Sequence, residues 1–108
     1  MGGLLPNGTM NIYKGTFRLA PEGRHDIAIG SPSLFLLFNP SNHLPFLGVI
    51  PAGWNDVIKS LFDNNLYTIN QETNGKICVV KKAGIVTVVN KLDSYQNYSY
   101  LVISLTSV

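Results

Sequence analysis

Charged side chains are scarce in this sequence. Asp, Glu, Lys and Arg make up 13% of its 108 residues, about half of the roughly 25% found in an average globular domain. Eight basic and six acidic residues give a net charge of +2, and only Lys81 and Lys82 are adjacent. Nucleic acid is therefore not expected as a partner, because phosphate binding requires a basic stripe or patch.

Residue types that hold metals or act as nucleophiles are also few. The two histidines, His25 and His43, are not part of an H-x-H or H-E-x-x-H arrangement, so no metal site is predicted. The one cysteine, Cys78, lies in an apolar run, which favours a small buried side chain. A reactive thiol is the alternative, since three lysines within four positions would lower its pKa.

No catalytic grouping is visible. The six acids are spread singly over loops and strand ends, and the sequence contains neither a G-x-S-x-G elbow nor a phosphate-binding glycine loop. We interpret His25 beside Asp26 as a surface pair at the start of a strand. We therefore expect no enzymatic activity, no catalytic residues and no cofactor.

Long hydrophobic runs are missing. The longest is about five residues, so neither an export signal nor a membrane-spanning segment is expected in this fragment. Residues 1–10 are predicted to be an N-terminal tail or linker, and residues 11–108 a single domain of common size.

Alternating and β-branched segments dominate the rest of the chain. Residues 12–19 place Tyr13, Phe17 and Leu19 on one face of a predicted strand. Pro21–Arg24 then predicts a turn in which Gly23 is free to take a positive φ. Altogether the patterns predict eight or nine short strands in an all-β, antiparallel, jelly-roll-like β-sandwich.

Three segments in the second half of the chain carry more specific predictions. Residues 55–66 fit a helix or an irregular strand, and the strand is favoured. Asn74-Gly75 predicts a tight hairpin turn between strands at 67–70 and 76–81. The apolar final strand, Tyr98–Leu105, is expected inside a sheet, because an exposed edge of that composition would recruit other chains.

The segment Leu34–Phe38 is apolar at every position, between Pro32 and Pro40. Such a strand needs cover on both faces, from the opposite sheet and from loops or a neighbouring subunit. Together with the low charge, this favours a homo-oligomer. The alternative is a monomer whose surface is covered by neutral polar groups, since the sequence contains eleven asparagines.

Two polar-aromatic segments are candidate ligand-binding sites. The first is Trp54, Asn55 and Asp56, and the second is Tyr95, Gln96 and Asn97. An aromatic ring can cover the C–H face of a sugar while amides and carboxylates bind its hydroxyl groups. The alternative is that the aromatic rings are part of the core or of an interface.

The order of these features resembles the distal receptor-binding head of phage tail-fibre and related prophage structural proteins. The resemblance rests on a series of strands and glycines: Lys14-Gly15-Thr16, the strand ending at Gly30, Leu34–Asn39, Leu47-Gly48-Val49-Ile50, Thr68-Ile69, and the Lys76–Asn90 hairpin with the Tyr-rich strand to Leu105.

The resemblance implies a trimeric, non-enzymatic β-sandwich in a virion or cell-surface assembly. Such a head would bind a bacterial surface glycan or protein, without membrane insertion. The chain departs from the family pattern in that no stalk precedes the domain. The alternatives are a purely structural β-sandwich subunit, a monomeric carbohydrate-binding module and a small enzyme accessory domain.

Overall fold

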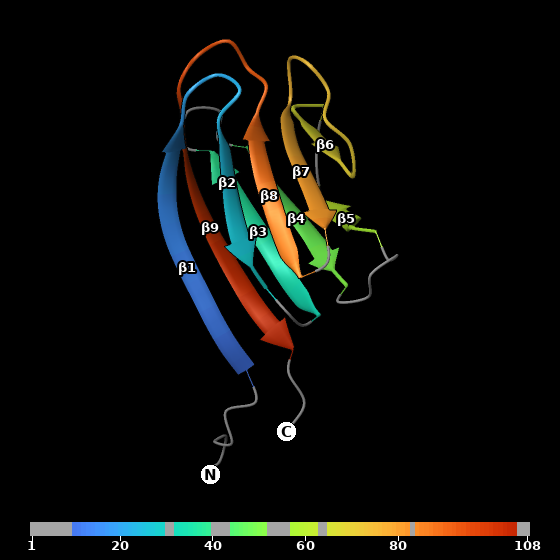
Figure 1. Cartoon of the computed structure of the whole chain (residues 1–108). Helices are drawn as coiled ribbons and strands as arrows, with labels where there is room; N and C mark the ends of the chain where they lie inside the picture. The colour runs from blue at the N-terminus through green and yellow to red at the C-terminus, as the bar shows by residue number, and fades with distance from the viewer. Residues whose placement is uncertain are drawn as a thin grey trace.

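The computed structural model describes residues 10–29, 32–39, 44–51, 57–62, 65–82 and 84–105, and these contain strands and no helix (Figure 1). The all-β prediction is confirmed. The nine strands are β1 (Met10–Leu19), β2 (Arg24–Ala28), β3 (Ser33–Asn39), β4 (Leu44–Ile50), β5 (Lys59–Phe62), β6 (Tyr67–Ile69), β7 (Ile77–Lys82), β8 (Ile85–Asn90) and β9 (Gln96–Leu105).

The strands form the two sheets of a sandwich. One sheet has five strands in the order β1-β9-β3-β4-β5, and the other has four in the order β2-β8-β7-β6. The first and last strands pair antiparallel, as do β2 and β8. This nesting of the two ends of the chain is shared with jelly rolls, whereas the β3–β4 hairpin within one sheet is a departure.

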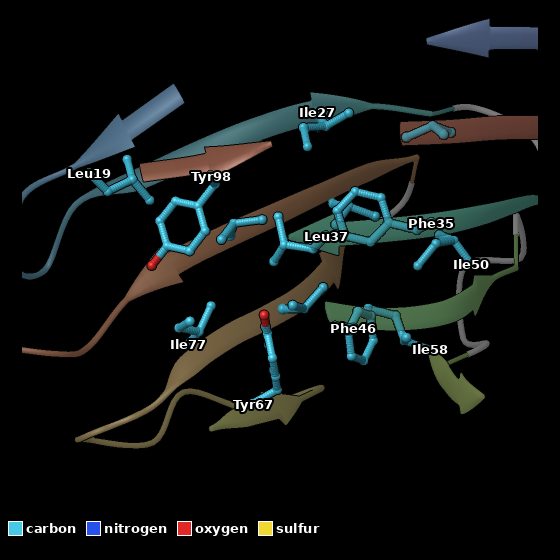
Figure 2. Close-up of a cluster of buried hydrophobic side chains, with 14 residues drawn as sticks. Leu19, Ile27, Phe35, Leu37, Phe46, Ile50, Ile58, Tyr67, Ile77 and Tyr98 are labelled. Atoms are coloured by element: carbon cyan, nitrogen blue, oxygen red, sulfur yellow. The ribbon is translucent and has the colours of Figure 1, made fainter. Parts of the chain in front are cut away.

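The core lies between the two sheets and follows from alternation along the strands. Phe35 and Leu37 on β3 and Tyr98 and Val102 on β9 are buried, and their sequence neighbours face outward. Figure 2 shows this cluster between the layers. Its other members are Leu19, Ile27, Phe46, Ile50, Ile58, Tyr67, Ile77, Val79, Val86 and Val88.

The final strand has the internal position that its composition predicted. β9 pairs with β1 on one side and with β3 on the other, so that Val102 lies between Tyr13 and Phe35. The backbone of this apolar strand is thus hydrogen-bonded along both edges. The segment at 55–66 contains β5, which confirms the strand and not the helix over its described part.

The predicted hairpin between β6 and β7 is wrong, because these two strands run parallel. Asn70 adopts a positive φ of 66° right after β6, and its backbone N–H donates to Val79 O at 2.9 Å. Because β6 is only three residues long, the connection 70–76 can lead the chain back alongside β6 to the end where it began. β7 then starts there and runs in the same direction as β6. Gly75 does take a positive φ of 81°, but in this return connection.

The turn between β1 and β2 also differs in detail from the prediction. The residue with positive φ is Glu22, at 69°, and not Gly23. The Gly23 N–H donates to Ala20 O at 2.8 Å, as in a turn with Pro at its second and a positive φ at its third position. Glycine is required at 23 for space, since a Cβ there would lie 2.9 Å from Ala20 O.

Candidate functional site

Four strand ends converge at one end of the sandwich. Leu19 at the end of β1 is opposite Gln96 at the start of β9, and Arg24 at the start of β2 is opposite Val89 near the end of β8. The β1–β2 and β8–β9 connections therefore lie together, at the top of Figure 1. We call residues 18–24, 70–76 and 90–97 the loop end.

Tyr95 is the exposed aromatic residue of the loop end. Its side chain is 60% exposed, and the guanidinium carbon of Arg18 lies 4.8 Å from the ring centroid. Asn97 is the register partner of Arg18 and is exposed as well. These three residues, the Tyr95 patch, combine an aromatic ring, a cation and an amide.

The ring and the guanidinium hold each other in place. A cation over an exposed ring stabilises the pair by about 0.5–1 kcal/mol. Arg18 is fixed at its base by the β1–β9 ladder, so the patch is built partly on strands and not only on a loop. An aromatic group fixed in this way loses less conformational entropy when a ligand binds.

Gln96 belongs to the interior and not to the surface. It is 9% exposed, its Oε1 accepts from Asn39 Nδ2 at 3.0 Å, and its Nε2 donates to Ser94 Oγ at 2.8 Å. Both polar atoms of its side-chain amide therefore already have hydrogen-bond partners inside the protein. Of the second predicted segment, Tyr95 and Asn97 are at the surface, and Gln96 supports them from below.

The first predicted segment, Trp54, Asn55 and Asp56, lies outside the described residues, as does His43. The two segments are therefore not placed relative to each other.

An ion-pair network joins three parts of the loop end. Glu72 accepts from Arg24 Nη1 and Nη2, both at 2.8 Å, and lies 3.6 Å from Lys91 Nζ. Lys91 in turn donates to Glu22 at 2.6 Å. The hydrogen bond from Arg24 lowers the pKa of Glu72 below its usual value, and the bond to Glu22 raises the pKa of Lys91. The network ties the β1–β2, β6–β7 and β8–β9 connections to one another.

Cys78 is a buried thiol. Its Sγ accepts from the backbone N–H of Thr73 at 3.2 Å, and burial raises its pKa. It thus lacks the low pKa and the exposure of a reactive cysteine.

Two further titratable side chains contribute to packing. His25 stacks on Phe17, with ring centroids 4.1 Å apart. Tyr98 is buried in the core, where burial and the proximity of Tyr67 raise its pKa. Within the described ranges, no three His, Cys, Asp or Glu side chains come together in a way that could hold a metal ion.

Sequence reasoning missed Arg18. Its partner across the sheet depends on the β1–β9 register, which the local sequence does not indicate. The composition of Tyr98–Leu105 indicated an internal strand, but not which residue of β1 would lie beside each of its residues.

No protein-family model, curated protein or solved structure matches this chain. In the part of the chain that the structure describes, no helix is long and apolar enough to cross a membrane.

Proposed function

We propose that this chain is a non-enzymatic receptor-binding head that recognises a bacterial cell-surface glycan, as the resemblance to phage tail-fibre heads implies. Its ligand-binding residues are Tyr95, Asn97 and Arg18, and Trp54, Asn55 and Asp56 form a second contact segment. It acts as a homo-oligomer, for which the resemblance implies a trimer, in a virion or a cell-surface assembly.

The observation that carries this proposal is the exposed Tyr95 ring on a rigid support. A tyrosine that is 60% exposed, next to an exposed amide, is the arrangement that saccharide binding uses. Below it, Gln96 and Asn39 join β9 to β3 by a buried hydrogen bond of 3.0 Å. The strands thus hold the patch in one geometry before a ligand arrives.

The cation adds a preference to this site. Among the described residues, Arg18 forms no ion pair with a carboxylate. Its guanidinium can therefore take a carboxylate or phosphate of an acidic saccharide in a bidentate contact. We expect acidic cell-wall glycans to bind more tightly than neutral ones, and this preference to weaken with salt.

A glycan array and isolated cell-wall polysaccharide test the proposal. Tyr95→Ala is expected to weaken binding at least about tenfold, the effect of losing roughly 1.4 kcal/mol, without a large loss of stability. Tyr13→Ala is the matched control, because Tyr13 on β1 is also an exposed tyrosine, at 45%, but lies away from the loop end. Equal binding by both variants would contradict the proposal.

A purely structural subunit is the second candidate, and the outer face of the five-stranded sheet favours it, because Leu34, Leu36 and Phe38 of β3 are at least partly exposed there. That face suits assembly whether or not a ligand binds. Oligomers that bind no glycan and no surface protein would support this candidate over the first.

A further inference from the structure

Two shallow hollows lie against β1 and β9, which run side by side along their whole length (Figure 1). Their volumes are about 290 and 440 Å³, and Lys14 and Ser99 line both of them. Ser99 follows the core residue Tyr98, so by alternation its side chain faces away from the core. Since ligand sites begin at about 300 Å³, hollows of this size can hold part of a small ligand.

Two neighbouring rows of the sheet ladder line the hollows. The first row is Thr16, Ser99 and Phe38, and the second is Lys14, Leu101 and Leu36. They present hydroxyl groups, a cation, apolar carbon and a phenyl ring that is 38% exposed. Sites that bind sugars combine such groups. We call Lys14, Thr16, Phe38 and Ser99 the Lys14 subsite.

The Tyr95 patch is the next row of the same ladder. Its Arg18 is two positions beyond Thr16 on β1, and its Asn97 is the register partner of Arg18. Side chains two positions apart in a strand share a face, so the patch and the Lys14 subsite face the same side with no row between them. A ligand that lies along β1 and β9 can therefore contact both.

Two cations stand at the ends of this part of the face. Among the described residues, neither Lys14 nor Arg18 forms an ion pair, and both are exposed. The carboxylates of the described residues lie on β2 or in the connections of the loop end: Asp26, Glu22, Glu72 and Asp93. The positive potential over β1 and β9 is thus not neutralised there, and it attracts anionic groups.

The spacing of the two cations selects a chain of linked units. Lys14 is four positions before Arg18, a separation of about 13 Å along an extended strand. One monosaccharide is too small to reach both side chains at once. A linear polysaccharide with acidic groups at intervals can place one group at each cation.

The position of the hollows favours a polysaccharide over an acidic peptide or a nucleic acid. A peptide binds a sheet by adding a strand at its edge, whereas the hollows extend over the face to β3. A nucleic acid carries a phosphate on every unit and requires more than two cations. A sugar chain has hydroxyl groups and C–H faces that match the outward hydroxyls and the exposed ring.

We infer that the Lys14 subsite binds a second acidic unit of a linear acidic polysaccharide whose first unit binds the Tyr95 patch. The inference rests on the proposed function, because it extends the same site. Lys14 pairs with the acidic group of the second unit, and Thr16 and Ser99 bind its hydroxyl groups. The Phe38 ring covers a C–H face. Because both contacts act on one chain, affinity increases with chain length until both are filled.

Titration calorimetry of the whole chain with oligomers from a single unit to an octamer tests the inference. Galacturonate oligomers supply carboxylates, and phosphate-linked oligosaccharides supply phosphates. Wild-type affinity should rise with length in at least one of these series and not with neutral maltose-type oligomers. Lys14→Gln should weaken octamer binding at least about tenfold, the loss expected for a charge-assisted contact. Binding of the single unit should change by less than about twofold, since the Tyr95 patch holds it.

Lys59→Gln is the matched control. Lys59 is also exposed on the outer face, but on β5 at the opposite edge of the sheet, so it should leave the length dependence unchanged. Phe38→Ala removes the ring without changing the charge. Its effect on octamer binding should persist at high salt, whereas the effect of Lys14→Gln should shrink. Circular dichroism checks that each variant is folded.

Equal octamer binding by Lys14→Gln and Lys59→Gln would overturn the inference. An affinity that does not rise with the length of either acidic series would also overturn it, as would equally tight binding of polyglutamate that Lys14→Gln weakens.

The proposed function is decided separately, by Tyr95→Ala on the glycan array. If Tyr95→Ala lost binding there while Lys14→Gln bound the octamer as Lys59→Gln does, the proposed function would stand and the second subsite alone would fall. If Tyr95→Ala bound the array as the wild type does, the proposed function would fall.

Discussion

The side chain of Asn90, on β8 of the four-stranded sheet, donates from Nδ2 to the backbone O of Leu19, the last residue of β1 in the five-stranded sheet, at 3.1 Å. The same amide donates to Ala20 O at 3.2 Å and Ser94 O at 2.9 Å, and its Oδ1 accepts from Leu92 N at 3.1 Å. One fully buried side chain thus joins both sheets and the β8–β9 loop.

Asn90→Ala should therefore be strongly destabilising. It leaves buried carbonyl groups without their donor, and we expect the free energy of unfolding to fall by about 3 kcal/mol. Urea denaturation measures the loss. Asn97→Ala, the same substitution at an exposed position nearby, should change it by less than about 0.5 kcal/mol. Similar losses for both variants would contradict this role.

Gln96 and Asn97 are sequence neighbours with different expected roles. Gln96→Ala breaks the buried bond to Asn39 and should lower the free energy of unfolding by about 1–3 kcal/mol, with a smaller loss of glycan affinity per folded molecule than Asn97→Ala causes. Asn97→Ala should leave the free energy of unfolding nearly unchanged and weaken glycan binding. Denaturation and array binding of both variants separate the roles, and a binding loss confined to Gln96→Ala would refute the assignment.

The Arg24–Glu72 pair makes stability depend on pH in the acid range. Arg24 lowers the pKa of Glu72 below its ordinary value of 4.5, so the contribution is complete above that value. It is lost as the pH falls below 4.5 through the lower folded-state pKa, because the unfolded state binds the proton more tightly there.

In urea titrations between pH 6 and pH 3, Glu72→Gln should thus lose stability less steeply than the wild type. Asp93→Asn is the control, because Asp93 is an exposed carboxylate that forms no ion pair with another described residue. Parallel curves for the wild type and Glu72→Gln would show that the pair does not act in this way.

Gly48 lies where two strands come close. A Cβ there would be 2.9 Å from Phe46 Cζ and 3.0 Å from Lys59 O, and the second of these atoms is backbone. Gly48→Ala is expected to cost about 2 kcal/mol. Gly75→Ala, at a positive φ in open space, should cost only about 1 kcal/mol of backbone strain. Thermal denaturation gives the order, and the reverse order would be inconsistent with this packing.

Cys78 should resist modification in the folded protein. Burial raises the pKa of its thiol, and the Thr73 N–H donates a hydrogen bond to its sulfur. Alkylation at neutral pH is expected to be at least about a hundredfold slower than in urea, since it requires local opening of the connection 70–76. Glu72→Gln should speed it, because the connection loses its tie to Arg24. If the thiol reacted equally fast in the folded and the urea-unfolded protein, the connection 70–76 would not be what shields Cys78.

Several features followed from local patterns because the physics behind them is local. Alternation in 12–19 indicated which face of β1 turns to the core, and Phe17 and Leu19 are indeed the more buried residues. The composition of Tyr98–Leu105 indicated an internal strand, and β9 is internal. The site on Trp54, Asn55 and Asp56 stays a prediction.

Other features depended on pairing between distant segments. The Asn74-Gly75 signal correctly indicated a positive φ but not the direction of the chain after it, which the Asn70 N–H to Val79 O bond and the short β6 decide. Likewise, nothing in Tyr95-Gln96-Asn97 indicates that the middle residue binds Asn39 in the interior, 57 positions away.

The sequence by itself determined that the chain is built of strands, which faces of them are apolar, and that the last strand is internal, since side-chain period and composition act within a few residues. The tertiary structure decided that Arg18 meets Tyr95, that β6 is parallel to β7, and that apolar residues of β1, β9, β3 and β4 line up in rows on the outer face of the five-stranded sheet. Register and sheet order set these relations, and both result from contacts between segments far apart in the chain.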